Sequence, residues 1–228
     1  MRSAIQEARK LATIEEIDYV FLVTALKKWA APRNVISRLV QSKDLIRVKK
    51  GIYLFGSDYA KRPYSPEVLA NKIYGPSYVS AEYALSFWGL IPEGVMEVTS
   101  MTTGKSKRFS TPAGRFSYYH LKPMTFSVGV THVRFSDEFG ALIATPEKAL
   151  ADLLMNRKEA GHTLSDLRRV LYEDFRIDPQ GFKQLKISML KAINRFYQNQ
   201  TLNTLIQLLT EEKKYARSHQ EYVTKVYL

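Results

Sequence analysis

The chain has 228 residues, 45% hydrophobic and 25% charged, a balance typical of a globular protein with room for one large domain or two small ones. It contains no cysteine, which excludes disulfides, thiolate catalysis and cysteine-bound metals, and it lacks the run of about 18 apolar residues that a membrane span needs. We therefore expect a cytoplasmic protein whose net charge of +12 attracts polyanions.

The positive charge is concentrated towards the two ends of the chain. Residues 1–62 hold thirteen Lys and Arg against six Asp and Glu, and residues 155–228 hold thirteen against eight, whereas the segment between them is balanced. The densest stretch, residues 27–50, has eight bases and a single acid, Asp44. Such clustering indicates a surface for nucleic acid, and the alternative is the solvated basic face of an ordinary soluble protein.

The N-terminal 29 residues are expected to form two helices with a short strand between them. Ser3 can cap a helix that extends to about residue 13, with an inward stripe formed by Ile5, Ala8, Leu11 and Ala12. Residues 18–21 are predicted as a short strand. Residues 22–29 are predicted as a second helix that ends in Lys27, Lys28 and Trp29, where the lysines are candidates for phosphate contacts and the tryptophan belongs to the core.

Residues 32–41 have the pattern of a helix with one apolar and one polar face. Pro32 suits the first turn, and apolar residues follow at helical spacing, namely Val35, Ile36, Leu39 and Val40. The opposite face carries side chains of the kinds that pair with phosphates and with base edges in a major groove: Arg33, Asn34, Ser37, Arg38 and Gln41. We interpret this segment as a recognition helix.

A basic hairpin is predicted directly after this helix, with strands at 45–49 and 52–55 and a turn at Lys50-Gly51. A basic helix followed by a basic hairpin resembles a winged helix-turn-helix domain, to which we assign residues 1–60. The expected contacts with the DNA backbone are Lys27, Lys28, Lys43, Arg47, Lys49 and Lys50, and Tyr53 is a further candidate in the wing.

Residues 57–66 show no apolar periodicity and are predicted as a linker to a second, mixed α/β domain at 64–228, so that the whole chain belongs to the α+β class. Helices are expected at 66–73 and 81–88. A small, mainly antiparallel sheet is expected at about 96–144, with strands at 96–102, 116–121, 130–135 and 141–144.

The last third of the chain is predicted as a helical portion at about 146–214. Helix starts are indicated by the capping residues Thr145, Thr163 and Asp178, and further helices are expected at 188–198 and 202–213. Residues 215–228 are polar and are expected to be loosely held.

A series of short motifs runs through the middle of the chain: Y-V-S-A-E-Y-A-L at 78–85, G-L-I-P-E-G-V at 89–95, V-T-S-M-T-T-G-K-S-K-R-F at 98–109, T-P-A-G-R-F-S-Y-Y-H at 111–120 and A-T-P-E-K-A-L-A-D-L-L at 144–154. In this order they resemble the AbiEi antitoxin family, with a similarity that covers roughly residues 12–155.

The resemblance implies an antitoxin of a type IV toxin-antitoxin system. Its winged helix would bind inverted repeats in double-stranded DNA upstream of its own operon and repress transcription. Its C-terminal domain would counteract a nucleotidyltransferase-like toxin, often without a stable complex. The family also includes regulators that have no toxin.

A second basic run occurs within the predicted sheet. Eleven residues without an acid contain Lys105, Lys107, Arg108 and Arg115, beside Phe109 and Phe116. Bases interleaved with aromatic rings can hold phosphates and stack on nucleobases, so this run is a candidate surface for nucleic acid or for the antitoxin activity. The alternative is a solvated hairpin loop over a core strand.

The sequence offers little support for catalysis. T-T-G-K-S at 102–106 lacks the glycine that a phosphate-binding loop needs at position 99. The four histidines show no metal spacing, although two of them could approach each other on adjacent strands: His120, His132, His162 and His219.

An arrangement of two acids and a lysine, as in some nucleases, is present at Glu147, Lys148 and Asp152. Ordinary roles suit both acids better, with Glu147 at the positive end of the helix dipole and Asp152 on the exposed side of the same helix. We therefore expect no enzyme, catalytic residue, metal or cofactor. The main alternative to a DNA-binding regulator is an interaction module that binds RNA or an acidic protein.

Overall fold

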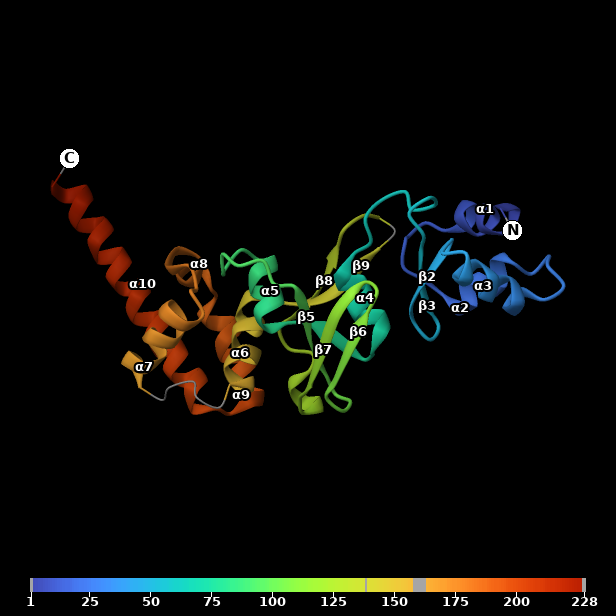
Figure 1. Cartoon of the computed structure of the whole chain (residues 1–228). Coiled ribbons are helices and arrows are strands. Elements are labelled where there is room, and N and C mark those ends of the chain that lie inside the picture. Colours follow the sequence, from blue (N-terminus) through green and yellow to red (C-terminus); the bar gives the residue numbers. More distant parts are fainter. Residues whose placement is uncertain (1, 138, 158–162, 227–228) are drawn as a thin grey trace.

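The structure is a computed structural model that describes residues 2–137, 139–157 and 163–226. The molecule is elongated (Figure 1). A small part with three helices lies at one end, a sheet lies in the middle, and a group of helices that ends in a long C-terminal helix lies at the other end. The α+β class expected from the sequence is confirmed.

Within residues 2–60, all of which are described, three helices pack with a three-stranded antiparallel sheet of order β1-β3-β2: α1 (Arg2–Leu11), β1 (Ile17–Asp18), α2 (Tyr19–Ala25), α3 (Pro32–Gln41), β2 (Leu45–Lys49) and β3 (Ile52–Phe55). The predicted recognition helix and both hairpin strands are confirmed as secondary structure.

Three details of the first elements were predicted wrongly. Helix α1 already includes Ser3, which therefore does not cap it, and Leu11 is 53% exposed rather than inward. The strand predicted at 18–21 ends at Asp18, because the Asp18 carboxylate accepts a hydrogen bond from the Phe21 backbone N–H at 2.8 Å and so caps α2.

The β2–β3 hairpin is shared by two hydrophobic cores. One face carries Leu45, Tyr53 and Phe55 into the core of the N-terminal part. The other face carries Val48, Ile52 and Leu54 into the main core of the rest of the chain. All four residues of β3 are buried because successive side chains of a strand point to opposite faces and both faces are covered.

The connection predicted as a linker is bonded back onto the N-terminal part. The Arg62 guanidinium donates to the Thr13 carbonyl at 2.8 Å, and the Lys61 backbone N–H donates to Glu15 Oε1 at 3.2 Å. The Ser65 backbone N–H donates to the carboxylate of Glu16. Helix α4 (Pro66–Ile73) then begins with Ser65 as its cap and has the bounds expected from the sequence.

The central sheet has six described strands in the order β6-β7-β5-β4-β9-β8: β4 (Ser77–Val79), β5 (Glu97–Thr102), β6 (Lys107–Thr111), β7 (Gly114–His120), β8 (Val130–Arg134) and β9 (Gly140–Ala144). The sheet is mainly antiparallel, as expected, because three of its five strand pairings are antiparallel; β5 runs parallel to β7 and β4 runs parallel to β9, which makes the sheet mixed. The chain passes from β5 to the edge strand β6 and then turns back into β7. Strand β7 therefore lies between β6 and β5 and runs in the same direction as β5.

Helices cover both faces of this sheet (Figure 1). On one face the Tyr118 hydroxyl donates to the Ala70 carbonyl of α4 at 2.7 Å. On the other face the Tyr78 hydroxyl donates to Asp152, which lies on α6 beside α5. The helices that follow α4 are α5 (Ala81–Phe87), the 3-10 turn η1 (Pro123–Thr125), α6 (Pro146–Asn156), α7 (Leu164–Arg169), the π-helical turn η2 (Val170–Asp174), α8 (Pro179–Gln184), α9 (Ile187–Tyr197) and α10 (Gln200–Val226).

The three predicted helix starts in the C-terminal portion are confirmed. Side-chain oxygens of Thr145, Thr163 and Asp178 accept backbone hydrogen bonds at the starts of α6, α7 and α8. Helix α10 continues to Val226, whereas the sequence predicted a loosely held tail from 215; residues 227–228 lie outside the described part.

Candidate nucleic-acid interface

The outer face of α3 is polar and open to solvent. Its inner residues Ile36 and Leu39 are buried in the N-terminal core. The five side chains on the opposite face are all exposed: Arg33, Asn34, Ser37, Arg38 and Gln41. The Ser37 hydroxyl donates to the Arg33 carbonyl at 3.1 Å, so its oxygen can still accept a hydrogen bond. The sequence-predicted set therefore lies on one accessible surface.

Further bases flank this helix and are exposed: Lys27, Lys28, Lys43, Arg47 and Lys50. Lys28 forms a solvent-exposed ion pair with Glu7 at 3.6 Å. Within the described part of the chain, no acid forms an ion pair with Arg33, Arg38 or Arg47. Lys43 has a left-handed backbone, with φ of 62°, in the turn between α3 and β2. These cations are available to an anionic partner.

Two residues assigned to the wing are not available. Lys49 Nζ donates to the Ile73 carbonyl at 2.6 Å and lies 4.8 Å from the centroid of the Phe109 ring. Tyr53 is only 6% exposed and belongs to the N-terminal core. Both assignments are corrected for the same reason, because the hairpin is enclosed between two parts of the molecule and only its turn and outer edge reach solvent.

The second basic run is divided between the two faces of the sheet. Lys107 is paired with Tyr118, whereas Arg108 is paired with Ser117 and Ser110 with Arg115. Since alternate residues of a strand point to opposite faces, Lys107 lies on the side of α4 and the β2–β3 hairpin, and Arg108 and Arg115 lie on the other side. Lys105 is exposed in the turn before β6. The four bases are exposed, but they do not form one continuous surface.

The motif at 144–154 encloses a buried polar cluster that sequence reasoning missed. Lys148 Nζ lies 3.1 Å from Asp152 Oδ1, and both side chains are almost completely buried. Asp152 accepts hydrogen bonds from the hydroxyls of Tyr78, Ser80 and Tyr197, and Lys148 also donates to the Thr125 carbonyl at 2.8 Å.

The expectation that Asp152 is exposed is therefore wrong, because α6 is enclosed by the sheet and by α9. Burial lowers the pKa of Lys148, while Asp152 opposes this shift. Burial and the nearby carboxylate raise the pKa of the Tyr197 hydroxyl. Because the cluster is closed to solvent, a nucleic-acid substrate cannot reach it. Glu147 does lie at the N-terminus of α6, where it accepts a hydrogen bond from the Lys186 backbone N–H at 2.8 Å.

The histidines do not assemble a metal site in the described part of the chain. His120 and His132 lie on β7 and β8, which are separated by three strands rather than adjacent. His162 and the side chain of His219 lie outside the described residues. Among the residues that are described, no group of three or more His, Cys, Asp or Glu could hold a metal ion, and no helix is both long and apolar enough to cross a membrane.

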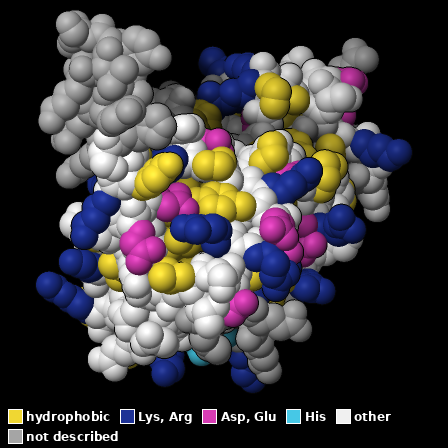
Figure 2. Space-filling model, turned by 90° about the vertical axis from the view of Figure 1, so that its left-hand side faces the viewer, with side chains coloured by type: hydrophobic (Ala, Val, Ile, Leu, Met, Phe, Trp, Pro, Cys, Tyr) yellow, Lys and Arg dark blue, Asp and Glu magenta, His cyan; other side chains and the backbone are white. Residues whose placement is uncertain are grey.

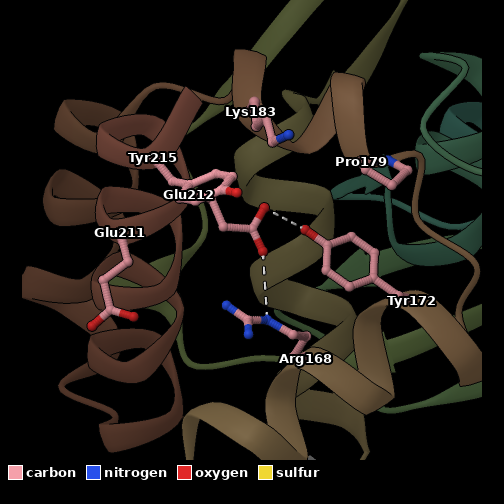
Figure 3. Close-up of a pocket in the computed structure, with 7 residues that line it drawn as sticks. All are labelled: Arg168, Tyr172, Pro179, Lys183, Glu211, Glu212 and Tyr215. Carbon is pink, nitrogen blue, oxygen red and sulfur yellow. Dashed lines mark hydrogen bonds and ion pairs between the residues drawn. The ribbon is translucent and has the colours of Figure 1, made fainter. Parts of the chain in front are cut away.

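A cavity of about 580 Å³ lies at the far end of the molecule, between α7, η2, α8 and α10. Glu212 lies between Tyr172 and Arg168 (Figure 3). It accepts a hydrogen bond from the Tyr172 hydroxyl at 2.7 Å and pairs with Arg168 Nε at 3.7 Å. Figure 2 shows this end of the molecule, where acids and bases are interspersed among hydrophobic side chains. It therefore differs from the α3 face, where bases predominate.

The chain matches no protein-family model and no curated protein sequence.

Proposed function

We propose that this chain is a DNA-binding transcriptional regulator whose N-terminal part is a winged helix-turn-helix with α3 as the recognition helix. The observation that carries this proposal is the outer face of α3, where two guanidiniums, two carboxamides and a hydroxyl are exposed together. In the major groove, arginine forms bidentate hydrogen bonds with guanine, asparagine and glutamine form them with adenine, and a serine hydroxyl can contact either base. The buried face of α3 fixes the helix against the N-terminal core.

The surroundings of α3 support contacts with the DNA backbone. Lys27 and Lys28 precede the helix, Lys43 follows it, and Arg47 and Lys50 are exposed on the hairpin that serves as the wing. Lysine and arginine at such positions neutralise phosphates and fix the orientation of the protein on the duplex without reading sequence. Lys49 and Tyr53 are excluded from this set by their contacts and burial.

The cellular role is proposed from the sequence motifs. Their resemblance to the AbiEi family supports a cytoplasmic antitoxin that binds inverted repeats upstream of its own operon and represses it. The rest of the chain would counteract a nucleotidyltransferase-like toxin without a stable complex, or would serve a regulator that has no toxin.

The test is a gel-shift titration of the full chain on the DNA upstream of its own gene and on scrambled DNA, at several salt concentrations. We expect selective binding and a log–log salt slope of roughly −0.9 for each phosphate contact. An Arg38→Ala substitution should cost about 1–3 kcal/mol of binding and relax sequence preference if the guanidinium makes a bidentate base contact. The combined Arg33→Ala and Arg38→Ala variant should lose selectivity.

The matched control removes two charges far from α3, through Lys191→Ala and Arg195→Ala, both exposed on α9. This variant should bind like the wild type. Equal, weak binding of the wild type to both DNAs would contradict the proposal and would favour an RNA or an acidic protein as the partner of the basic face.

A further inference from the structure

The cavity at the far end of the molecule is enclosed by packed helices. Each helical wall is fixed from behind by buried side chains that neighbour the lining residues, namely Leu167, Leu171, Phe182 and Leu209. The Tyr172 ring also contacts the Phe182 ring edge to face, with centroids 6.0 Å apart. The cavity of about 580 Å³ is therefore shaped by the core, and its volume is typical of a small-molecule site.

One part of this cavity is a neutral unit formed by Tyr172, Glu212 and Arg168 (Figure 3). The Glu212 side chain is only 14% exposed, and its carboxylate is shared between the Tyr172 hydroxyl and the Arg168 guanidinium. Burial and the hydrogen bond to Glu212 raise the pKa of Tyr172, so the phenol stays protonated near neutral pH. The charges of Arg168 and Glu212 therefore offset each other.

Two other charged groups of the cavity have no ion-pair partner in the described part of the chain. No described acid pairs with Lys183 of α8, and no described base pairs with Glu211 of α10. Glu211 accepts a hydrogen bond from the Gln207 amide at 3.0 Å. Figure 3 shows Lys183 and Glu211 at different sides of the cavity, with Glu212 between them. The cavity thus presents one separate positive group and one separate negative group.

This balance of charge selects the class of ligand. A polyanion would be repelled by Glu211 and Glu212, and a simple cation or anion would neutralise one of the two separate groups and leave the other. A ligand that carries both an ammonium and a carboxylate neutralises both groups. The rings of Tyr215 and Pro179 line the same cavity and provide apolar surface for an uncharged side chain.

We propose that this cavity binds a small zwitterion with an apolar side chain, either a free amino acid or a short peptide whose two termini are charged. The carboxylate pairs with Lys183, the ammonium pairs with Glu211, and the side chain packs against Tyr215 and Pro179. Hydrogen bonds between ionised groups are stronger than those between neutral groups. The site lies at the opposite end of the molecule from α3 (Figure 1), so the proposal does not depend on DNA binding.

The two sources of this chemistry differ in the separation of their charges. A free amino acid carries both charges on one carbon atom, whereas each further residue of an extended peptide adds about 3.3–3.6 Å between them. Isothermal titration calorimetry of the full chain with L-phenylalanine and with the dipeptide alanyl-phenylalanine therefore distinguishes them. The ligand that binds more tightly identifies the length that the cavity accepts.

Blocked forms of the same two ligands test the charge pairs. N-acetylation removes the ammonium and amidation removes the carboxylate. We expect each blocked form to bind about tenfold or more weakly than the free ligand, because one hydrogen-bonded charge pair is lost.

Variants assign each charge to its residue. Lys183→Gln should bind the free ligand and its amide equally, because the partner of the carboxylate is gone, and should still discriminate against the N-acetyl form. Glu211→Gln should show the reverse pattern. Lys191→Gln changes an exposed lysine of α9 outside the cavity and should bind like the wild type. Thermal unfolding shows whether each variant is folded.

Absence of binding of both free ligands to the wild type would overturn the inference. Equal binding of the free and blocked forms would also overturn it, since the two charges would then make no contact. Equal losses in Lys183→Gln and Lys191→Gln would show an effect of overall charge rather than of the cavity. None of these results alters the gel-shift test of α3, so the two proposals fail separately.

Discussion

Single residues in the interior of this protein show how a buried charge is accommodated. Lys148 and Asp152 lie one helical turn apart on α6, in a core where an isolated charge would be strongly destabilising. Asp152 is compensated by the ammonium group of Lys148 and by three hydroxyls, and the ammonium group also reaches a backbone carbonyl. The ammonium group also donates to the Tyr197 hydroxyl, so the carboxylate oxygens and all three ammonium hydrogens have hydrogen-bond partners.

Replacing Lys148 alone should lower the free energy of unfolding far more than removing the charges of both Lys148 and Asp152. Lys148→Met leaves a carboxylate uncompensated in the core and should lower the free energy of unfolding by about 3–5 kcal/mol. Addition of Asp152→Asn should recover part of this loss, because the amide oxygen still accepts hydroxyl hydrogen bonds without a charge. Urea denaturation measures the free energy of unfolding of both variants.

The control for this comparison is Lys191→Met, which changes an exposed lysine on α9 and should alter stability by no more than about 0.5 kcal/mol. If the single and double variants at Lys148 and Asp152 lose the same stability, the lysine contributes through its volume rather than its charge.

At the scale of elements, the connection between the two parts, residues 57–66, is held by hydrogen bonds to the N-terminal part. It is bonded to the loop between α1 and β1, where Glu16 accepts the Ser65 backbone N–H and Arg62 donates to the Thr13 carbonyl. Burial raises the pKa of Glu16 above its ordinary value of 4.5, although the Ser65 hydrogen bond and the nearby Lys72 and Arg62 act in the opposite direction.

This shift predicts a pH dependence of stability. With a raised pKa, the folded protein holds the Glu16 proton to higher pH than the unfolded chain does, so this contribution to stability is present below pH 4.5 and is lost as the pH rises through the folded-state pKa. Glu16→Gln keeps a hydrogen-bond acceptor and does not titrate. It should therefore gain stability relative to the wild type as the pH is raised from 4.5 to neutrality.

Urea midpoints across this pH range provide the measurement, and Glu173→Gln, which removes an exposed carboxylate, gives a reference curve. If Glu16→Gln instead loses stability relative to the wild type as the pH rises, attraction by Lys72 and Arg62 outweighs the effect of burial.

The elements that the sequence predicts well are those with a local signal. Helix α4 has its predicted bounds, and the hydroxyl and carboxylate caps of α6, α7 and α8 are correct, because capping and apolar periodicity depend on residues only a few positions apart. Strands β4 and β6 were missed. The first has three residues, and the second is a basic edge strand without apolar alternation.

The residues of the candidate site also fall into two groups, those whose exposure follows from the local sequence and those whose environment depends on the tertiary fold. Exposure of the outer face of α3 follows from its own periodicity and was predictable. The different environments of Lys49 and Lys50 were not, because Lys49 is held by Ile73, 24 residues further along the chain, and by Phe109, which is more distant still. Adjacent identical residues cannot be distinguished without the tertiary fold.

At the scale of the whole molecule, the two cores should unfold together because they share one hairpin. The chain has two tryptophans, and each packs against a different core, Trp29 in the N-terminal part and Trp88 in the main core. In Trp88→Phe the fluorescence reports the first core, and in Trp29→Phe it reports the second. We expect coincident urea transitions for the two variants.

Leu54→Ala provides a direct test of this coupling. It removes a buried side chain from the main core and should cost about 2–5 kcal/mol. Combined with each tryptophan variant, it should shift both transitions to lower urea by the same amount. A shift of the Trp88 signal alone would show that the two parts fold independently.

The shared hairpin also sets a limit on how this protein can be divided or recombined. A fragment that ends near residue 60 retains the whole of α3, yet it leaves Val48, Ile52 and Leu54 without the surface that covers them. Such a fragment presents an apolar strand face to water and is prone to association. Transfer of residues 1–60 to another protein therefore requires either a new covering surface or polar residues at these three positions, because the boundary between the two parts passes through the shared hairpin.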